Sequence, residues 1–366
     1  MRWLSRFSRR KKVEILFSIL RFILPCAMLF FVFLCSQLPG LAEKYIQNCY
    51  PAIATLLSFA SCSVPFSLFD VLIIAAITGF VISIVLIFMR KISFFRWIKA
   101  VLSSVLWIFS WFYMAWGIAY FRPGFHERFE VEQPVADTVY FEALVFRYID
   151  SLNKSYISEP YFDVNEIDKA IEAGYRKFSK QLRIPYPCGK RRAKSTVIEG
   201  LMTKSGVSGF FNPFFNEELL NFFQLPVGFP FSLAHEKAHQ FGIASESECN
   251  LYAAIVCCSS DYPLVRYSGY LETVWYLLKN LRKISQEKYR EAIKKINPHI
   301  IDDYNEIGAH WQKALNQTIS AAQSKVYDSY LKTNKQQSGI LSYSEMTILL
   351  VTWEKIVRNF DEEIEK

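Results

Sequence analysis

The sequence predicts a mainly α-helical protein in which three N-terminal transmembrane helices precede a zincin-like α+β domain with a small sheet. Three observations predict it: three long apolar stretches, helical periodicity from residue 122 onward, and two short strand signals beside an HExxH motif. The chain has 366 residues, of which 52% are hydrophobic and 16% aromatic. This length and composition exclude a disordered or fibrous chain and indicate at least two structural units.

The apolar stretches cover about residues 17–38, 71–89 and 100–121. A bilayer crossing needs about 20 mostly apolar residues, so each stretch is long enough. The second and third carry no charge, and the first carries Arg21 near its start, where the side chain can extend to the headgroups. No small-x-small cleavage site follows the first stretch, so we interpret it as an uncleaved anchor. Residues 1–121 therefore form the predicted membrane domain.

The net charge of +8 is concentrated beside these stretches. Residues 1–12 hold six Lys or Arg and residues 90–99 hold four, while the rest of the chain has 32 basic and 34 acidic residues. Because short basic loops stay in the cytoplasm, both clusters are predicted there. The loop between residues 39 and 70 and the domain of residues 122–366 are then extracytoplasmic. Their near-neutral charge disfavours nucleic-acid binding.

The cysteines give weaker signals. Cys49 and Cys62 share the predicted outer loop and could pair in an oxidising compartment. Cys249, Cys257 and Cys258 are expected to be ordinary buried cysteines, because no paired CxxC spacing indicates a thiolate zinc site.

Amphipathic periodicity predicts helices in the exterior domain at residues 139–153, 164–182, 269–281 and 346–359, with two further candidates at 288–296 and 311–333. Strand signals are sparse. The best are residues 195–202 and 206–212, which suit a short sheet. The second strand could bind an extended peptide along its edge or be an ordinary edge strand.

The informative motif is His235-Glu236-Lys237-Ala238-His239, the HExxH pattern. On a helix, residues i and i+4 share one face, so both imidazoles can reach one zinc ion while Glu236 lies beside the open position of the metal. The alternative is a pair of ordinary helix histidines beside a surface glutamate. Random placement would give this spacing in fewer than about one chain in a hundred, which favours the zinc interpretation.

A catalytic zinc needs a third protein ligand, and Glu246 and Glu248 are the candidates. Gly242 is placed to end the motif helix in a left-handed conformation, and Ser245 with Glu248 has capping-box spacing for a new helix. The cap already explains Glu248. We favour Glu246, because Asn250 then lies one turn later, where it can orient a ligand histidine.

HExxH followed by Glu-x-x-x-Asn resembles the gluzincin metallopeptidases. The segments VPFSLFDVL, SGVSGFFNPFFNEELLN, PFSLAHEKAHQFG and ESECNLYAA together resemble a family of bacterial inner-membrane proteins known only as a domain of unknown function. The likeness runs from the first apolar stretch to YLKTNKQQSGILSYSE. It implies an inner-membrane, zinc-dependent peptidase with a periplasmic gluzincin-type domain and a peptide or protein substrate.

The mechanism implied has Glu236 as general base, with His235, His239 and Glu246 as Zn²⁺ ligands and Asn250 behind them. The sequence does not identify the residue that would donate a hydrogen bond to the oxyanion. Suitable residue types are Tyr330, Tyr343, His299 and His310, and no spacing selects one of them. Lys237 departs from the family pattern, because that position is usually small or apolar. A lysine there must reach solvent or find a partner. It motivates the alternative of a non-catalytic sensor or scaffold with a structural zinc site.

Overall fold

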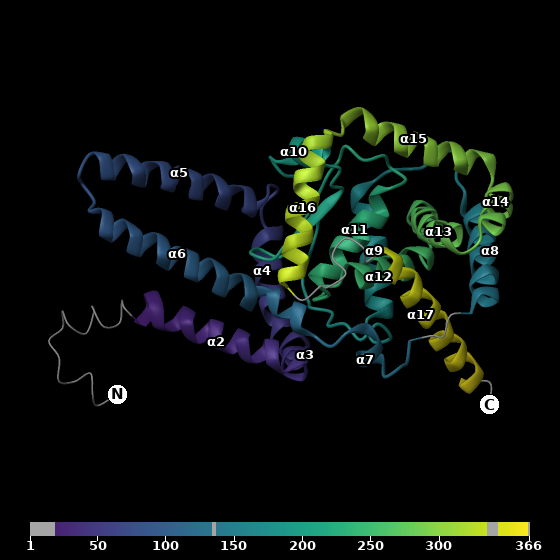
Figure 1. Cartoon of the computed structure of the whole chain (residues 1–366), viewed down its shortest axis with the longest axis horizontal. Helices are drawn as coiled ribbons and strands as arrows, with labels where there is room; N and C mark the ends of the chain where they lie inside the picture. Colours follow the sequence, from purple (N-terminus) through teal and green to yellow (C-terminus); the bar gives the residue numbers. More distant parts are fainter. Residues whose placement is uncertain (1–18, 134–136, 335–342, 365–366) are drawn as a thin grey trace.

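The computed structural model describes residues 19–133, 137–334 and 343–364. Within them the chain is mainly helical and forms a membrane arm and a body (Figure 1). The arm and its connections comprise η2 (Ile19–Ile23), α2 (Leu24–Gln37), α3 (Pro39–Asn48), α4 (Tyr50–Cys62), α5 (Leu68–Phe88), α6 (Phe94–Ala115) and η3 (Gly117–Phe121). The predicted basic cluster at residues 1–12 lies outside the described residues.

Three helices are long and apolar enough to cross a membrane: Leu20–Gln37, Leu68–Phe88 and Phe94–Ala115. This agrees with the three predicted stretches, but the third begins and ends earlier than residues 100–121. At Trp116 the backbone leaves the helical region with φ −166°, and Gly117–Phe121 forms a 3₁₀ turn inside the body. Hydropathy does not distinguish burial in protein from burial in lipid, which explains the difference.

The segment predicted as an outer loop is largely helical. It forms α3 and α4, and Cys49 and Cys62 lie at the two ends of α4. Thirteen residues of helix separate the two ends by about 20 Å, whereas a disulfide needs Cα atoms within about 7 Å. Both thiols are free, so the pairing that the sequence left possible does not occur.

The body contains helices and one small sheet. Its helices are α7 (Phe125–Phe129), α8 (Thr138–Ser155), α9 (Val164–Phe178), α10 (Glu199–Ser205), α11 (Phe229–Gln240), α12 (Glu246–Cys258), α13 (Pro263–Ile284), α14 (Gln286–Lys295), α15 (Pro298–Ala314), α16 (Gln317–Thr333) and α17 (Tyr343–Ile364). The predicted helix 311–333 is two helices, because Asn316 interrupts it and caps α16 by accepting a hydrogen bond from the Ile319 N–H.

The sheet has the order β1-β3-β2, with β1 (Ala193–Lys194), β2 (Gly209–Asn212) and β3 (Glu217–Leu220). β1 runs parallel to β3, and β2 pairs antiparallel with β3 in the register Gly209 to Leu220. The strand predicted at residues 195–202 is wrong. Its second half, residues 199–202, belongs to α10, whose buried Met202 and Ser205 are three residues apart and which ends at Gly206 with φ +77°.

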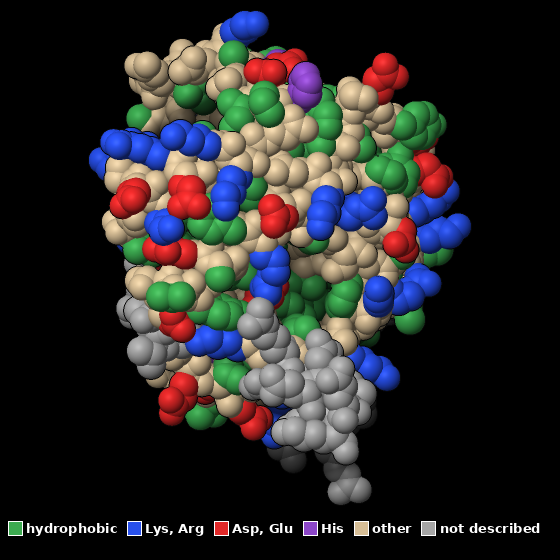
Figure 2. Space-filling model, turned by 90° about the vertical axis from the view of Figure 1, so that its right-hand side faces the viewer, with side chains coloured by type: hydrophobic (Ala, Val, Ile, Leu, Met, Phe, Trp, Pro, Cys, Tyr) green, Lys and Arg blue, Asp and Glu red, His purple; other side chains and the backbone are tan. Residues whose placement is uncertain are grey.

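The face of the body opposite the membrane arm carries scattered Lys, Arg, Asp and Glu side chains (Figure 2). Apolar side chains appear among them singly or in small groups, as on the water-facing surface of a soluble domain. The body therefore has a polar far side and a near side that joins the arm.

Candidate metal centre

α11 and α12 form a helical hairpin that carries the motif. α11 begins with Pro230 in its first turn and ends at Gln240. Gly242 follows with φ +83°, and a Cβ there would lie 2.9 Å from a methyl carbon of Ile46, so this turn needs glycine. Ser245 then caps α12 by accepting a hydrogen bond from the Glu248 N–H. The turn and cap agree with the prediction and bring Glu246 back to the histidines.

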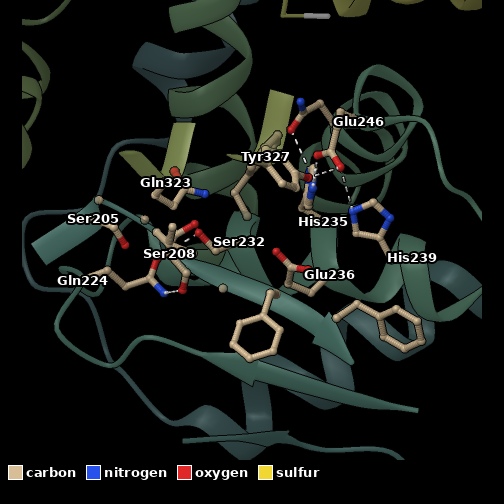
Figure 3. Close-up of a pocket in the computed structure, with 18 of the residues that line it drawn as sticks. Ser205, Ser208, Gln224, Ser232, His235, Glu236, His239, Glu246, Gln323 and Tyr327 are labelled. Atoms are coloured by element: carbon tan, nitrogen blue, oxygen red, sulfur yellow. Dashed lines mark hydrogen bonds and ion pairs between the residues drawn. The ribbon is translucent and has the colours of Figure 1, made fainter. Parts of the chain in front are cut away.

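The structure brings His235, His239 and Glu246 together. Their potential ligand atoms lie within 4.8 Å of one another, and no other such group occurs among the described residues. His235 Nε2 is 3.1 Å from one carboxylate oxygen of Glu246, and His239 Nε2 is 3.5 Å from the other. Figure 3 shows both rings converging on this carboxylate. Glu248 points elsewhere, to Arg128 in a buried ion pair.

Hydrogen bonds determine which nitrogen of His235 and of His239 faces the Glu246 carboxylate. His235 Nδ1 is 2.8 Å from Asn250 Oδ1, and His239 Nδ1 is 2.8 Å from the carbonyl oxygen of Ile243. Because both partners accept, each Nδ1 carries a proton, and Nε2 is the ring atom that faces Glu246 and could bind a metal. Asn250 occupies the supporting position that the sequence predicts for it.

Glu236 lies on the side of the site that faces β2 (Figure 3). A Cβ at Gly209 would be 3.1 Å from Glu236 Cγ, so strand and carboxylate are in close contact. Burial raises the pKa of Glu236 to about 7, with the charge of Glu246 adding to the rise and His235 opposing it. Burial also acts to raise the pKa of Glu246, but the two histidines outweigh it and hold that pKa well below its ordinary value.

Sequence reasoning missed Tyr327. This α16 residue donates a 2.6 Å hydrogen bond to Glu246 Oε1, although it lies 81 residues away in the chain. No spacing or motif signals that contact. Burial and the neighbouring Glu246 charge raise the pKa of Tyr327, which keeps its proton on the hydroxyl. α16 therefore covers the carboxylate ligand with a phenol donor.

The four residues predicted as possible donors to the oxyanion lie in different parts of the chain's structure where they are described. Tyr330 lines the pocket and bonds to Tyr120 at 2.9 Å. His310 is 2.6 Å from the Phe223 carbonyl oxygen, and His299 is exposed on α15. The side chain of Tyr343 lies outside the described residues. Of the three described, Tyr330 alone borders the site.

The site opens into a pocket of about 810 Å³ bounded by β2, α11, α13, α15 and α16. Polar side chains line the part shown in Figure 3, namely Ser205, Ser208, Gln224, Ser232 and Gln323. Aromatic side chains, including Trp116 and Phe211, line the end beside His239. The pocket is large enough for several residues of a peptide.

Lys237 points away from the pocket and is fully buried. Its ammonium lies 2.8 Å from Asp168, 2.7 Å from Glu172 and 3.4 Å from Glu218. Burial disfavours its charged form, but the three carboxylates outweigh that effect and raise the pKa of Lys237. The departure from the family pattern therefore has a structural explanation in a buried charge cluster behind the motif helix.

The C-terminal end of α11 is held by donors from the arm and its connections. The Trp116 indole N–H donates to the His239 carbonyl at 2.7 Å, and the Tyr50 hydroxyl donates to that of Gln240 at 2.7 Å. The Arg122 guanidinium donates to the Gly242 carbonyl at 2.7 Å. These bonds add donors to carbonyls at the end of α11 and in the turn after it, and they fix the backbone around His239.

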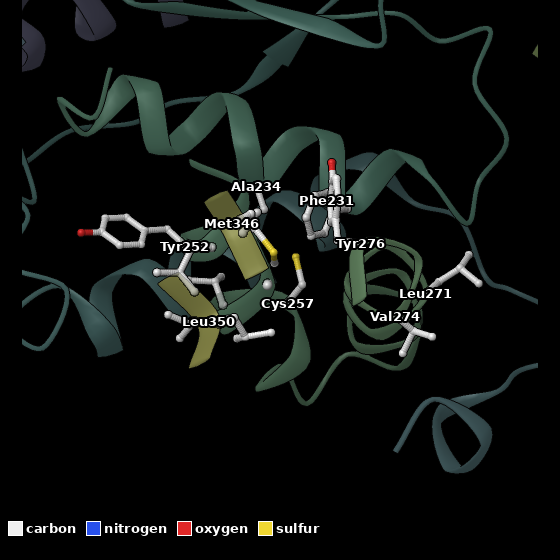
Figure 4. Close-up of a cluster of buried hydrophobic side chains, with 14 of the residues drawn as sticks. Phe231, Ala234, Tyr252, Cys257, Leu271, Val274, Tyr276, Met346 and Leu350 are labelled. Atoms are coloured by element: carbon white, nitrogen blue, oxygen red, sulfur yellow. The ribbon is translucent and has the colours of Figure 1, made fainter. Parts of the chain in front are cut away.

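Behind the site, α11, α12, α13 and α17 share a hydrophobic core (Figure 4). Members of this core are Phe231, Ala234, Tyr252, Cys257, Leu271, Val274, Tyr276, Met346 and Leu350. As predicted, Cys249 and Cys257 are buried, whereas Cys258 is half-buried. The core makes the two helices of the hairpin a rigid support for the ligand set.

A third acidic residue in the pocket, Glu272 on α13, leads to a pH prediction. Burial raises its pKa to about 7, opposed by Lys279, from an ordinary value of 4.5. Between these two pH values the folded chain holds a proton that the unfolded chain lacks, so this group lowers stability as the pH rises through the window. We expect Glu272→Gln to remove that decline.

The measurement is thermal unfolding of the detergent-solubilised chain across this pH range, with wild type and variant compared at each pH. The variant should gain stability over wild type at pH values above the window and lose that advantage below it. Parallel pH profiles for the two proteins would show that Glu272 ionises as an ordinary solvated acid.

Residues 45–351 match a family model described as protein of unknown function (DUF3810). Comparisons with curated proteins and with solved structures gave no match. The matched residues include α4, α5, α6 and the motif hairpin, but not α2.

Proposed function

The chain belongs to this family of unknown function, DUF3810, and we propose that it is a membrane-anchored zinc metallopeptidase with a zincin-like, gluzincin-type body. The observation that carries the proposal is the convergence of two Nε2 atoms on the Glu246 carboxylate, 3.1 and 3.5 Å away. Two neutral imidazoles and one carboxylate are a ligand set of catalytic zinc, and they leave a position for water and substrate.

The donor set fits the metal in a further respect. Both Nδ1 atoms are bonded to acceptors, so the rings need not turn or change tautomer to bind. Zinc bound there lowers the pKa of a water to about 7 and polarises a carbonyl group. His235, His239 and Glu246 would hold the ion, with Asn250 and the Ile243 carbonyl orienting the rings.

Glu236 supplies the proton transfer. Its carboxylate takes a proton from the water whose oxygen bonds to the substrate carbonyl carbon, and then gives this proton to the amine nitrogen as the C–N bond breaks. The Glu236 carboxylate is buried beside the ligand candidates and in contact with β2, where it can both accept and release this proton. Tyr330, whose hydroxyl accepts from Tyr120 and lines the pocket, offers its own proton to the developing oxyanion.

β2 supports peptide binding beside Glu236. It pairs with β3 on one side, and its residues Gly209 to Phe211 border the pocket. An extended peptide can add to such an edge through main-chain hydrogen bonds. The contact between Gly209 and Glu236 would then hold the scissile bond next to the general base.

The arm supports an extracytoplasmic body. Arg90 and Lys91 lie in the turn between α5 and α6, and Arg96 lies in the first turn of α6. Figure 1 places this turn at the end of the arm farthest from the body. Because basic turns stay in the cytoplasm, the body would lie on the opposite side, in the periplasm if the host membrane is a bacterial inner membrane.

Metal content tests the ligand assignment. Purified wild-type protein should hold about one zinc per chain. Glu246→Gln should lose most of this zinc, because a neutral amide replaces the anionic ligand. The matched variant Glu248→Gln should keep it, because Glu248 serves the cap and Arg128. Metal analysis after dialysis gives the measurement, and zinc loss in Glu248→Gln with retention in Glu246→Gln would reverse the assignment.

The competing function is a sensor or scaffold with a structural zinc site. The sensor hypothesis is based on Lys237, a lysine at a position that is usually small or apolar. The three carboxylates around its ammonium group explain why a lysine is tolerated there. Cleavage of a peptide library by the zinc-loaded protein decides between the two, since a scaffold would bind zinc and cleave nothing.

A further inference from the structure

The two faces of α4 have the reverse of the usual polarity. Its exposed face is apolar and consists of Ala52, Leu56, Phe59 and Ala60, with Leu56 and Phe59 each 69% exposed. Its buried face consists of Tyr50, whose hydroxyl donates to the Gln240 carbonyl, and the small residues Ala54, Ser58 and Ser61. A helix between protein and water turns its apolar side inward. The outward apolar face of α4 therefore suits lipid.

The position of α4 in the fold also suits contact between its apolar face and lipid. Figure 1 shows α4 running across the ends of the membrane arm, roughly perpendicular to α5 and α6. Only residues 63–67 separate α4 from α5, which enters the membrane span at Leu68. A helix fixed in this way between two spans lies in the plane of the bilayer surface, where apolar side chains reach the boundary of the acyl chains.

A basic loop borders the same helix. The Thr55 hydroxyl donates to the Cys188 carbonyl at 2.9 Å, and the Arg192 guanidinium donates to the Val64 carbonyl. Lys190, between these two contacts, is exposed. Cations beside an outward apolar face match the anionic headgroups of a membrane. The far face in Figure 2 has both signs of charge instead.

The pocket begins at the membrane end of the body. Trp116 directly follows α6, and its ring lies 5.8 Å from the His239 ring and 5.4 Å from that of Phe211. β2 also rests on the arm, because the rings of Phe210 and Phe69 are 5.9 Å apart. Trp116 alone therefore separates the membrane span of α6 from the metal-ligand candidate His239.

We infer that α4 lies in the lipid interface and that the pocket acts on polypeptide segments held at the membrane surface, next to a lipid or transmembrane anchor. This substrate class rests on the proposed peptidase function. An extended segment that leaves the bilayer beside α5 and α6 reaches β2 at once, whereas a soluble chain gains no such local concentration.

Photo-crosslinking tests the placement. p-Benzoylphenylalanine is incorporated at Phe59 in the full-length chain, in vesicles of phosphatidylcholine and phosphatidylglycerol. Val139, 77% exposed on α8 at the far side of the body, is the water-facing control, and Phe80, 51% exposed within α5, is the lipid-facing control. Lipid adducts are expected at positions 59 and 80 but not at 139. Adducts at 80 alone would overturn the interfacial placement of α4.

Cleavage in the same vesicles tests the substrate class. A randomised peptide library is presented free, or attached to palmitoyl lipid through a Gly-Ser spacer of about five residues, which reaches about 17 Å, or of about thirty residues. The short-spacer library should be cleaved at least about tenfold faster than either of the others, because effective concentration falls with spacer length.

The outcomes separate the two proposals. Equal rates for free and tethered libraries, or faster cleavage with the long spacer, would overturn membrane-surface selectivity and leave the peptidase intact. No cleavage of any library by zinc-loaded protein would overturn the peptidase proposal and the substrate class with it. The adducts at position 59 would still decide where α4 lies.

Discussion

Glu236→Gln is expected to leave zinc content unchanged and to slow peptide hydrolysis by about 10²–10⁴-fold. Glutamine has the shape of glutamate, so it keeps the contact with Gly209 and the position beside the ligands. Its amide cannot accept the proton of the attacking water. The measurement is the cleavage rate of the zinc-loaded variant, with metal analysis on the same preparation.

Glu248→Gln is the matched control for this experiment. It makes the same chemical change two residues from Glu246, but at a side chain whose partner is Arg128. Zinc and hydrolysis should both persist in it. Wild-type rates in the Glu236 variant, with the metal present, would remove Glu236 from the mechanism, and comparable losses in both variants would indicate a general effect on the body.

Lys237→Met is expected to lower the free energy of unfolding by about 3–5 kcal/mol, because it leaves buried carboxylates without their shared cation. Arg191 still pairs with Glu172 at 2.9 Å, but Asp168 and Glu218 lose a charged partner. Denaturant unfolding of the detergent-solubilised chain gives the measurement. Lys169→Met, which removes an exposed pair with Glu166, is the control and should change little.

A double variant isolates the charge effect from packing. Burial raises the pKa of Glu218 to about 7 even with Lys237 present, so this carboxylate is costly to keep ionised. Adding Glu218→Gln to Lys237→Met should recover part of the lost stability, with a coupling energy of about 0.5–3 kcal/mol. Strict additivity of the two changes would show that the cluster does not depend on charge compensation.

The motif hairpin could be predicted because its determinants are local. HExxH sets the spacing of the histidines, Gly242 turns the chain, and Ser245 starts the next helix. Helix geometry then decides where Glu246 and Glu248 point. Ser245 caps α12 as predicted, but the Glu248 side chain pairs with Arg128 instead of returning to the cap as the capping box predicts.

Contacts between distant segments could not be predicted. Tyr327 reaches Glu246 from 81 residues away, and the partners of Lys237 come from α9 and β3. β3 itself was missed because Glu217 and Glu218 interrupt its apolar pattern. Lys194 and Lys237 compensate their buried charges, and Glu217 also accepts from the Leu68 and Phe69 N–H groups, contacts that no local window reveals.

The anchoring of α11 by Trp116, Tyr50 and Arg122 has a practical consequence for dissecting the protein. A fragment trimmed to begin at residue 122 would carry every candidate ligand and the general base, yet would lack the indole and the phenol that secure the backbone around His239. Its inactivity would say nothing about the chemistry. The N-terminal apolar segments are thus a structural part of the proposed metal site, and biochemical work must begin with the intact chain in detergent or lipid.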